Sequence, residues 1–331
     1  MQNLILKETI KTASAWLGKD LKHDQRWQYV FSEHDLATFD QLVRQLEQKG
    51  LAAPDFTQED FVIQDPALLL LIGKWVNELE HGFGFCVLKG LSLERYTEAE
   101  LANIYYGLGL YMGLPVTQNP RGDLLGVVAN VGDKTQKTTR TYETNSYLPY
   151  HTDLSDVVGL LCIRKAKEGG LSSLVSASMV YNHILEHYPE YLGYYYYPTY
   201  CDHLGDDQPT LTPIFSYHQN KLSCRYLRAY IELGHERKNV PLAEVEKQAL
   251  DIFDGFIHHP DFRLDMMLEP GDIQFCNNYV VMHSRTGFED YDELEQRRKL
   301  LRLWLKMPNA RELAPDFPGR NGIAKKIEVA A

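Results

Sequence analysis

The sequence has no basic cluster, no long hydrophobic run and few cysteines, and each absence excludes a class of protein. Its 331 residues carry a net charge of -11 with Lys and Arg scattered along the chain, so nothing favours a polyanion such as nucleic acid. The longest apolar run, Ala67 to Ile72, is far shorter than the roughly 20 residues of a membrane span. The first residues contain no apolar signal-peptide core. We therefore expect a soluble, cytoplasmic protein with a small-molecule partner and neither a nucleic-acid nor a membrane partner; its oligomeric state is open.

The cysteines and the glycines also exclude common sites. Five cysteines form no Cys-x-x-Cys pair, and most of them lie in apolar contexts, which predicts buried thiols in a reducing compartment rather than disulfides or a zinc site. Gly107-Leu108-Gly109 is followed by Gly113, which misses the dinucleotide-binding spacing. The P-loop, H-E-x-x-H and G-x-S-x-G motifs are absent.

The predicted secondary structure changes along the chain from mainly helices to mainly short strands. The first 80 residues read mainly as helices, and Asp65-Pro66 opens a helical pattern that Gly82 closes. Thr97 to Met112 is a second predicted helix, with Gly113 as its stop. Beyond Leu124 the pattern changes to short strands, for which the candidates are residues 125–131, 157–163, 174–176, 213–216, 222–226, 263–267, 272–276, 279–283 and 299–307.

Short strands at this spacing predict a sandwich or jelly roll. Helical patterns at Val180 to Leu192 and Leu242 to His258 interrupt them, so the fold class is α+β, with a jelly-roll core and flanking helices. We expect one structural domain: residues 1–82 as a mainly helical extension, 83–310 as the core and 311–331 as a tail. The four consecutive tyrosines Tyr194 to Tyr197 predict a half-buried strand or helix end, with a substrate-facing aromatic wall as the alternative.

The chemistry is concentrated in His151-Thr152-Asp153. In an extended segment His151 and Asp153 point to the same face, so an imidazole and a carboxylate can bind one metal ion. His283 is the best third ligand, since it ends an apolar strand that follows the Pro270-Gly271-Asp272 turn. Two histidines and one carboxylate form the facial triad that holds Fe(II) and leaves the opposite positions open.

Arg298 and Arg302 are four residues apart in the last predicted strand and would share one face. A guanidinium at the edge of an apolar pocket can grip a carboxylate with two hydrogen bonds. The alternative is an internal pair with Asp or Glu. Arg302 is the more enclosed by Leu and Trp, so a bound carboxylate would explain its position.

With these residues in place, the chain resembles the TauD/TfdA-like family of Fe(II)/2-oxoglutarate-dependent dioxygenases. The resemblance covers roughly Gly84 to Pro308 and implies a double-stranded β-helix core. Its ordered landmarks are His151-Thr152-Asp153, Gly169-Gly170-Leu171-Ser172, Pro270-Gly271-Asp272, Asn277-Asn278, His283 and the Arg298/Arg302 pair.

The resemblance implies roles for these residues. His151, Asp153 and His283 would bind the iron, and Arg302 would bind the distal carboxylate of 2-oxoglutarate. Ser172 would donate a hydroxyl to the same carboxylate, at a place where many members have Thr. Arg298 would lie near the substrate or the other carboxylate of the cosubstrate.

Five further residues are candidate substrate contacts. His283-Ser284-Arg285 resembles a His-x-Arg pattern of amino-acid hydroxylases, and Arg285 would either receive an acidic group of the substrate or pair with Glu289 or Asp290. Asn145, Ser146, Gln118 and Asn119 occupy places where related enzymes contact substrate, with solvated loops as the alternative.

The resemblance implies that Fe(II), 2-oxoglutarate and O2 together hydroxylate an aliphatic C–H bond of a small molecule, either amino-acid-like or a natural-product intermediate, with release of succinate and CO2. Halogenating relatives have a small residue where Asp153 stands, so hydroxylation is the expected outcome, and desaturation, epoxidation or cyclisation are alternatives. Two readings from other classes are a non-catalytic metal-binding jelly-roll sensor and a cupin-type isomerase or hydrolase that ignores 2-oxoglutarate.

Overall fold

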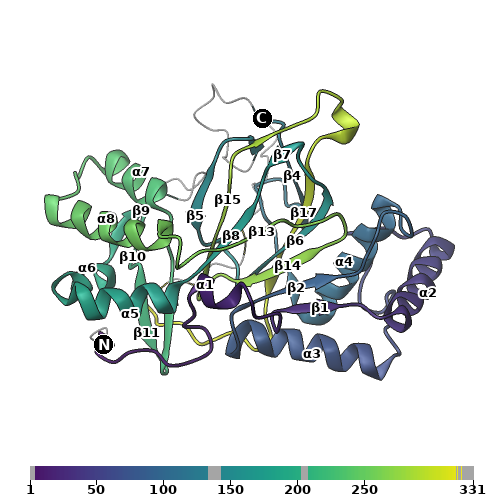
Figure 1. Ribbon diagram of the computed structural model, residues 1–331, viewed down its shortest axis with the longest axis horizontal. Coiled ribbons are helices and arrows are strands. Elements are labelled where there is room, and N and C mark those ends of the chain that lie inside the picture. The colour runs from purple at the N-terminus through teal and green to yellow at the C-terminus, as the bar shows by residue number, and fades with distance from the viewer. Residues whose placement is uncertain (1–3, 133–142, 203–207, 318, 320–321, 323–331) are drawn as a thin grey trace, which may run out of the picture.

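Two facing β-sheets form the centre of the protein, and helices surround them (Figure 1). The computed structural model describes residues 4–132, 143–202, 208–317, 319 and 322. Within these residues no helix is both long and apolar enough to cross a membrane.

The larger sheet has seven strands in the order β1-β2-β14-β6-β17-β3, with β4 also paired to β17. Its pairs are antiparallel except for β1 and β2, which are parallel. The strands are β1 (Gln28–Val30), β2 (Phe85–Lys89), β3 (Leu114–Pro115), β4 (Leu125–Ala129), β6 (Val157–Arg164), β14 (Ile273–Asn277) and β17 (Lys299–Lys306).

The smaller sheet has four strands in the order β13-β8-β15-β5. They are β5 (Leu148–His151), β8 (Ser172–Ser176), β13 (Leu264–Met266) and β15 (Val281–Arg285). Side chains of both sheets, such as Val158 and Trp304 from the larger and Leu174 from the smaller, pack in one buried cluster. This core between two sheets confirms the predicted jelly roll.

Alternation along β17 decides which side chains face the core between the sheets. Leu301, Leu303 and Leu305 pack with the helices on the outer face of the larger sheet. Leu300 and Trp304 point the other way, into the cluster between the sheets. Period two then places Arg298 and Arg302 on this inner face, as the sequence predicts.

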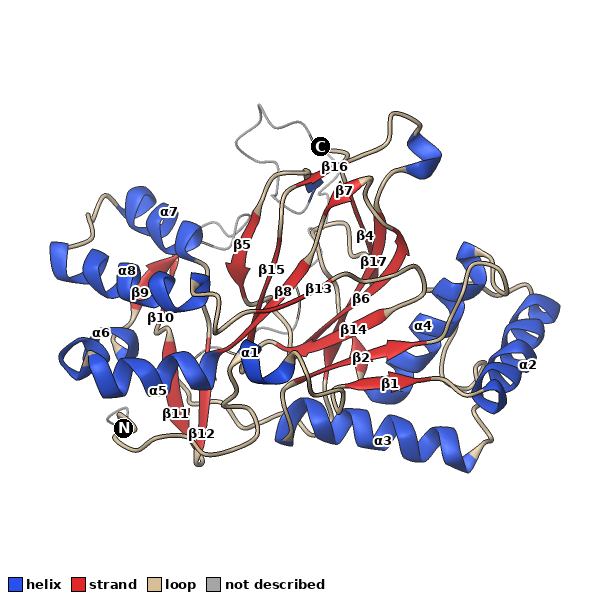
Figure 2. Ribbon diagram, viewed as in Figure 1, coloured by secondary structure: helices blue, strands red, loops and turns tan. Residues whose placement is uncertain are grey.

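Helices cover the outer face of the larger sheet (Figure 2). The helix over residues 66–81 begins at the N-cap Asp65, whose side chain accepts a hydrogen bond from the Ala67 amide. The next helix begins with a capping box between Thr97 and Glu100, as its sequence predicts. The N-terminal helices are α1 (Gly18–Leu21), α2 (Glu33–Lys49), α3 (Pro66–His81) and α4 (Glu98–Met112).

A second group of helices and hairpins packs around its own buried cluster, which we call the helical lobe. The sequence predicts two of its helices but not α7, because few apolar residues recur in that charged segment. The lobe contains α5 (Ala177–His187), the 3-10 helix η2 (Pro189–Tyr191), α6 (Leu192–Tyr196), β9 (Thr199–Cys201), β10 (Thr210–Thr212), β11 (Phe215–His218), β12 (Lys221–Cys224), α7 (Arg228–Lys238) and α8 (Glu244–His258).

Three smaller elements complete the described chain. The short strands β7 (Glu168–Gly169) and β16 (Phe288–Glu289) pair with each other, and the 3-10 helix η3 (Leu294–Gln296) precedes β17. The N-terminal region also contributes β1 to the larger sheet. The division at residues 82 and 310 stays a prediction. All five cysteines are buried free thiols, as expected.

Candidate active site

His151, Asp153 and His283 meet between the two sheets. His151 ends β5, and His283 lies directly opposite it on β15. One candidate ligand atom from each of the three residues lies within 4.8 Å of the other two. The Asp153 carboxylate is 3.8 Å from His151 Nε2 and 3.6 Å from His283 Nε2. Metal–nitrogen and metal–oxygen bonds of about 2.1 Å span such separations, so the three side chains fit one metal ion.

Backbone contacts hold the extended segment that carries the first two residues of the triad. The Thr152 amide donates to the Tyr226 carbonyl at 3.0 Å, and the Tyr226 amide donates to Thr152 Oγ1 at 3.3 Å. Thr152 therefore serves the contact with the helical lobe, while its two neighbours face the metal position, as predicted.

Neighbouring groups orient the side chains of the triad. His151 Nδ1 lies 2.8 Å from the Pro149 carbonyl, which can only accept, so Nδ1 carries the proton and Nε2 keeps its lone pair for a metal. Asp153 accepts a 3.0 Å hydrogen bond at Oδ2 from Trp304 Nε1. Its backbone amide donates to Asn278 Oδ1 at 3.1 Å. These contacts leave Asp153 Oδ1 as the freer oxygen.

The protonation states also suit a metal site. Burial opposes ionisation of Asp153, but the positive charge of Arg302, the adjacent imidazoles of His283 and His151, and the hydrogen bond from Trp304 outweigh burial, so the pKa of Asp153 lies below its usual value. Burial, reinforced by His151, lowers the pKa of His283 to about 3. At neutral pH His283 is therefore a neutral imidazole, the form that binds metals.

The triad lies in a cavity that also contains three buried arginines. We call this space the metal cavity. Its lining residues are Val128, Leu148, His151, Asp153, Leu160, Ser172, Leu268, His283, Ser284, Arg285, Arg298, Leu300 and Arg302.

Arg285 and Arg298 are close to the same aromatic ring. Their guanidinium carbons lie 4.6 Å and 5.2 Å from the centre of the Phe288 ring. Each has an Nη1 atom that is buried without a hydrogen-bond partner among the described residues. Burial lowers the pKa of both groups to about 10, and for Arg285 the charge of Arg298 adds to the effect. Buried guanidinium groups in this state call for an anion.

The remaining contacts of Arg285 are with backbone carbonyls. Its Nε donates to the Thr286 carbonyl at 3.2 Å, and its Nη2 donates to the Ser146 carbonyl. No ion pair joins Arg285 to Glu289 or Asp290 among the described residues, and the charge of Asp290 only partly offsets the effect of burial on the pKa of Arg285. Of the two alternatives for Arg285, the geometry therefore favours an exogenous anion.

Ser172 lies opposite Arg285 in the pairing of β8 with β15. Its hydroxyl donates to Gln274 Oε1 at 2.8 Å across the core. On the adjoining turn, a Cβ at Gly170 would lie 3.2 Å from Arg298 Nε, so glycine leaves room for the guanidinium.

Arg302 lies closer to the triad along the strand than Arg298. Its charge acts on both Asp153 and His283, and its guanidinium lies 4.8 Å from the Trp304 ring centre. Arg302 Nε donates to Gln118 Oε1 at 2.7 Å. The two arginines thus line the same cavity at different distances from the metal position.

Four predicted substrate contacts are absent from the described lining of the metal cavity. Gln118 is fully buried behind Arg302. Asn119 bonds to Asp123 within its own turn. Asn145 Nδ2 donates to the Phe288 carbonyl at 3.1 Å, and Ser146 offers its carbonyl to Arg285. Of the four, Gln118 and Ser146 contact arginines that line the cavity.

The sequence analysis missed Trp304, Gln274 and Phe288 as parts of the site. Trp304 carried a usable signal, since it continues the period-two series of Arg298 and Arg302. Gln274 is a polar residue in an apolar strand, which is a weaker signal. Nothing local to Phe288 shows that two arginines pack on it.

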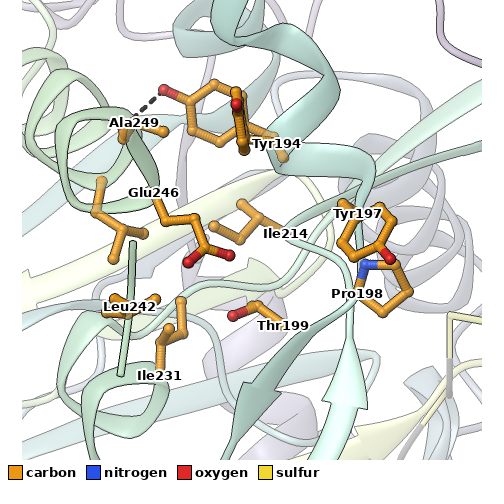
Figure 3. Close-up of a pocket in the computed structure, with 11 residues that line it drawn as sticks. Tyr194, Tyr197, Pro198, Thr199, Ile214, Ile231, Leu242, Glu246 and Ala249 are labelled. Atoms are coloured by element: carbon orange, nitrogen blue, oxygen red, sulfur yellow. Dashed lines mark hydrogen bonds between the residues drawn. The ribbon is translucent and has the colours of Figure 1, made fainter. Parts of the chain in front are cut away.

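A second pocket lies in the helical lobe, and we call it the lobe pocket (Figure 3). Tyr194, Tyr195 and Tyr197 line it together with apolar side chains from α7 and α8. Tyr195 is buried and donates from its hydroxyl to the Ala249 carbonyl at 2.7 Å, whereas Tyr197 is exposed. The tyrosine run is thus a helix end, and none of its members lines the metal cavity.

Comparison with known proteins agrees with this site. The model of the "Taurine catabolism dioxygenase TauD, TfdA family" matches residues 43–304. The chain belongs to this family. It is therefore an Fe(II)/2-oxoglutarate-dependent dioxygenase, whose cofactors are Fe(II) and 2-oxoglutarate and whose cosubstrate is O2.

Two curated relatives match almost the whole chain. FR-33289 synthase of Streptomyces rubellomurinus is 34% identical over 318 residues, covering 93% of each chain. The taurine hydroxylase-like protein SAT17 of Stachybotrys chartarum is 27% identical over 310 residues, covering 87% of this chain and 77% of the relative.

Solved structures share the fold. Asparagine oxygenase in complex with Fe(II), 2S,3S-3-hydroxyasparagine and succinate has a TM-score of 0.67 at 16% identity, covering 85% of this chain and 93% of that chain. The non-heme iron oxygenase OrfP in complex with Fe, succinate and (3S)-hydroxy-L-Arg has a TM-score of 0.63 at 13% identity, covering 84% and 94%.

Proposed function

We propose that this dioxygenase hydroxylates an aliphatic C–H bond of a small anionic molecule, either amino-acid-like or a natural-product intermediate. The observation that carries the proposal is one cavity that contains both a metal triad and three buried guanidinium groups. When bound there, iron and 2-oxoglutarate supply O2 activation coupled to release of succinate and CO2.

We propose His151, Asp153 and His283 as the iron ligands. The hydrogen bond from His151 Nδ1 to the Pro149 carbonyl supports this, because it directs Nε2 toward the other two side chains. Trp304 and Asn278 would keep Asp153 in place as the metal enters. A carboxylate at Asp153 also supports hydroxylation over halogenation, since it fills the position that a halide would need.

We propose that 2-oxoglutarate lies along β17 and is held by Arg298, Arg302 and Ser172. The triad would hold the metal that binds the keto-acid end, so the far carboxylate would be held by residues of the cavity more distant from the triad. Arg298, with its buried Nη1, is one of these residues, and Ser172 lies nearby opposite Arg285. The geometry therefore favours Arg298 for the far carboxylate, whereas the sequence-based assignment gave that role to Arg302.

The charge of the cavity favours an anionic substrate. Three guanidinium groups and one carboxylate line it, and a ferrous ion would add two positive charges. The 2-oxoglutarate dianion cancels only part of this excess, and buried charge is costly unless it is paired. Arg285 would then receive an acidic group of the substrate. The amino-acid products named in the two solved complexes are compatible with such a group.

The burial of the triad would keep water away from the reacting groups. The three triad residues are each at most 9% exposed, and apolar side chains such as Leu148, Leu160 and Leu268 line the space around them. This lining would exclude water from the bound substrate, and a fixed orientation would select one carbon.

The test begins with binding. Anaerobic addition of Fe(II) and then 2-oxoglutarate should give a weak visible charge-transfer band. A panel of carboxylic, sulfonic and phosphonic acids, each matched with a neutral amide or ester, should then be screened for coupled succinate release. We expect succinate with one or more acids and not with their neutral partners. Turnover of the neutral compounds alone would refute the anionic substrate class.

Mass analysis of the product then identifies the outcome. Gain of one oxygen atom indicates hydroxylation or epoxidation, and loss of two hydrogen atoms indicates desaturation or cyclisation. We further propose that the enzyme works in the cytoplasm without a nucleic-acid or membrane partner, because ferrous iron needs a reducing compartment and the net charge of -11 disfavours polyanions.

A further inference from the structure

Gln118 is a buried side chain that contacts one cavity residue at two points. It lies in the segment that connects β3 to β4 along the chain, and its side chain is fully buried. Its Nε2 donates to the backbone carbonyl of Arg302 at 2.7 Å and to the Leu124 carbonyl at 2.8 Å. Its Oε1 accepts from Arg302 Nε at 2.7 Å. The amide orientation is fixed, because both carbonyls can only accept and the guanidinium can only donate.

The opposite strand leaves room for this contact. Gly126 on β4 is the register partner of Arg302 on β17. A Cβ at Gly126 would lie 2.8 Å from Gln118 Oε1, which is too close for an ordinary contact. A glycine at this strand position therefore makes space for the amide of Gln118 beside the guanidinium.

The chemical type of Gln118 matters as much as its position. A carboxylate in the same place would pair with Arg302 and cancel its charge. A carboxamide holds Nε with a neutral acceptor, so Gln118 adds no negative charge beside the guanidinium. Arg302 is also fixed from another side by the Trp304 ring.

We propose that Gln118 is a positioning residue that fixes the guanidinium of Arg302 and preserves its charge for an anion bound beside the metal. This inference rests on the proposed function, since it needs an anion in the metal cavity. Gln118 acts through Arg302 and does not itself touch the ligand.

The test compares two substitutions of similar size. Gln118→Glu keeps the shape and adds a negative charge at Arg302, whereas Gln118→Met keeps the length and removes the hydrogen bonds. With 2-oxoglutarate as the probe, titrated anaerobically into the Fe(II)-loaded protein, Gln118→Glu should weaken binding on the order of tenfold or more. Gln118→Met should weaken it less, by about threefold. Fe(II) affinity, measured without 2-oxoglutarate, should stay within about twofold of wild type.

A double-mutant cycle separates positioning from direct contact. In an Arg302→Met background, Gln118→Met should have no further effect on 2-oxoglutarate affinity, because the group that it positions is gone. An equal loss in both backgrounds would overturn the proposal, as would wild-type affinity in both Gln118 variants. If Gln118→Met does not fold, the 2-oxoglutarate affinity of the isosteric variant Gln118→Glu tests the proposal: weaker binding supports it, and wild-type affinity overturns it. Failure of the wild-type protein to bind 2-oxoglutarate would instead refute the proposed function and, with it, this inference.

Discussion

The metal cavity and the lobe pocket differ in how their polar atoms are satisfied. In the metal cavity, Arg285 and Arg298 each bury an Nη1 atom that lacks a partner among the described residues. In the lobe pocket, the Tyr195 hydroxyl, the Thr199 hydroxyl and the Glu246 carboxylate all have hydrogen-bond partners. Both pockets are concave and largely apolar, so shape alone does not separate them.

The difference shows how a site prepared for ligands can be recognised. A protein that folds for stability alone pairs its buried charges, because an unpaired buried charge costs free energy. Unpaired guanidinium groups next to a metal triad indicate that ligands complete the cavity.

Removal of a triad ligand should have the largest effect. Asp153→Ala or His283→Ala should weaken Fe(II) binding by more than about 100-fold and abolish succinate release, because the ion loses a first ligand. Exposed His23 is the matched control, and His23→Ala should bind iron normally. Anaerobic titration with Fe(II) measures the iron affinity of the triad variants and of the control. Tight iron binding by Asp153→Ala would contradict the proposed triad.

Substitution of Arg298 should weaken the cosubstrate and spare the fold. Arg298→Met should raise the Kd of 2-oxoglutarate by about 30- to 1000-fold, the equivalent of roughly 2–4 kcal/mol for a buried charge partner. The Tm of the ligand-free variant should stay equal or rise, because a buried charge without a partner has been replaced by an apolar chain. Calorimetry and thermal unfolding measure these effects.

Two further variants serve as comparisons for Arg298→Met. Arg121→Met, on an exposed turn, should change neither quantity. A larger loss in Arg302→Met than in Arg298→Met would return the far carboxylate to Arg302, as the sequence-based assignment had it.

Loss of the hydrogen bond from Trp304 should weaken the metal site moderately. Trp304→Phe removes the donor to Asp153 Oδ2, and such supporting contacts are worth about 10- to 100-fold in metal affinity. Trp16→Phe is the matched control, since Trp16 Nε1 donates to the Phe83 carbonyl away from the triad. Equal iron affinity in the two variants would show that Trp304 does not support the metal.

Acid should destabilise the metal-free protein partly through His283. The pKa of His283 is about 3 in the fold and about 6.5 when unfolded, so between these values the unfolded state binds the extra proton. The free energy of unfolding should therefore fall as the pH is lowered from about 6.5 toward 3. His283→Gln should flatten this dependence in chemical denaturation experiments, and an unchanged slope would argue against a neutral buried imidazole.

Changes in the lobe pocket should have the smallest effect. Glu246→Gln keeps an acceptor for the Ala243 amide, and it should leave succinate release within about twofold of wild type. Leu242→Ala should likewise affect stability only. A marked loss of turnover in either variant would show that the lobe pocket affects catalysis in the metal cavity.

Many helices and strands, and the faces on which the candidate residues lie, were predictable because they depend on local periodicity. The cap at Asp65 and the alternation along residues 299–306 follow from neighbouring residues alone. The strand carrying His283 was predicted to end there but continues to Arg285, because pairing with β8 extends it. The helix α7 escaped prediction because tertiary packing, rather than its own apolar pattern, holds it.

The order of amino acids alone specifies which chemical groups the site contains and on which face of its strand each lies, because strand geometry allows only two faces. Only the tertiary structure decided which side chains meet across the core: Ser172 with Gln274, Arg302 with Gln118, and Trp304 with Asp153. These partners lie 102, 184 and 151 residues apart. Their contact depends on which strands pair and on how the two sheets face each other, which no local pattern encodes.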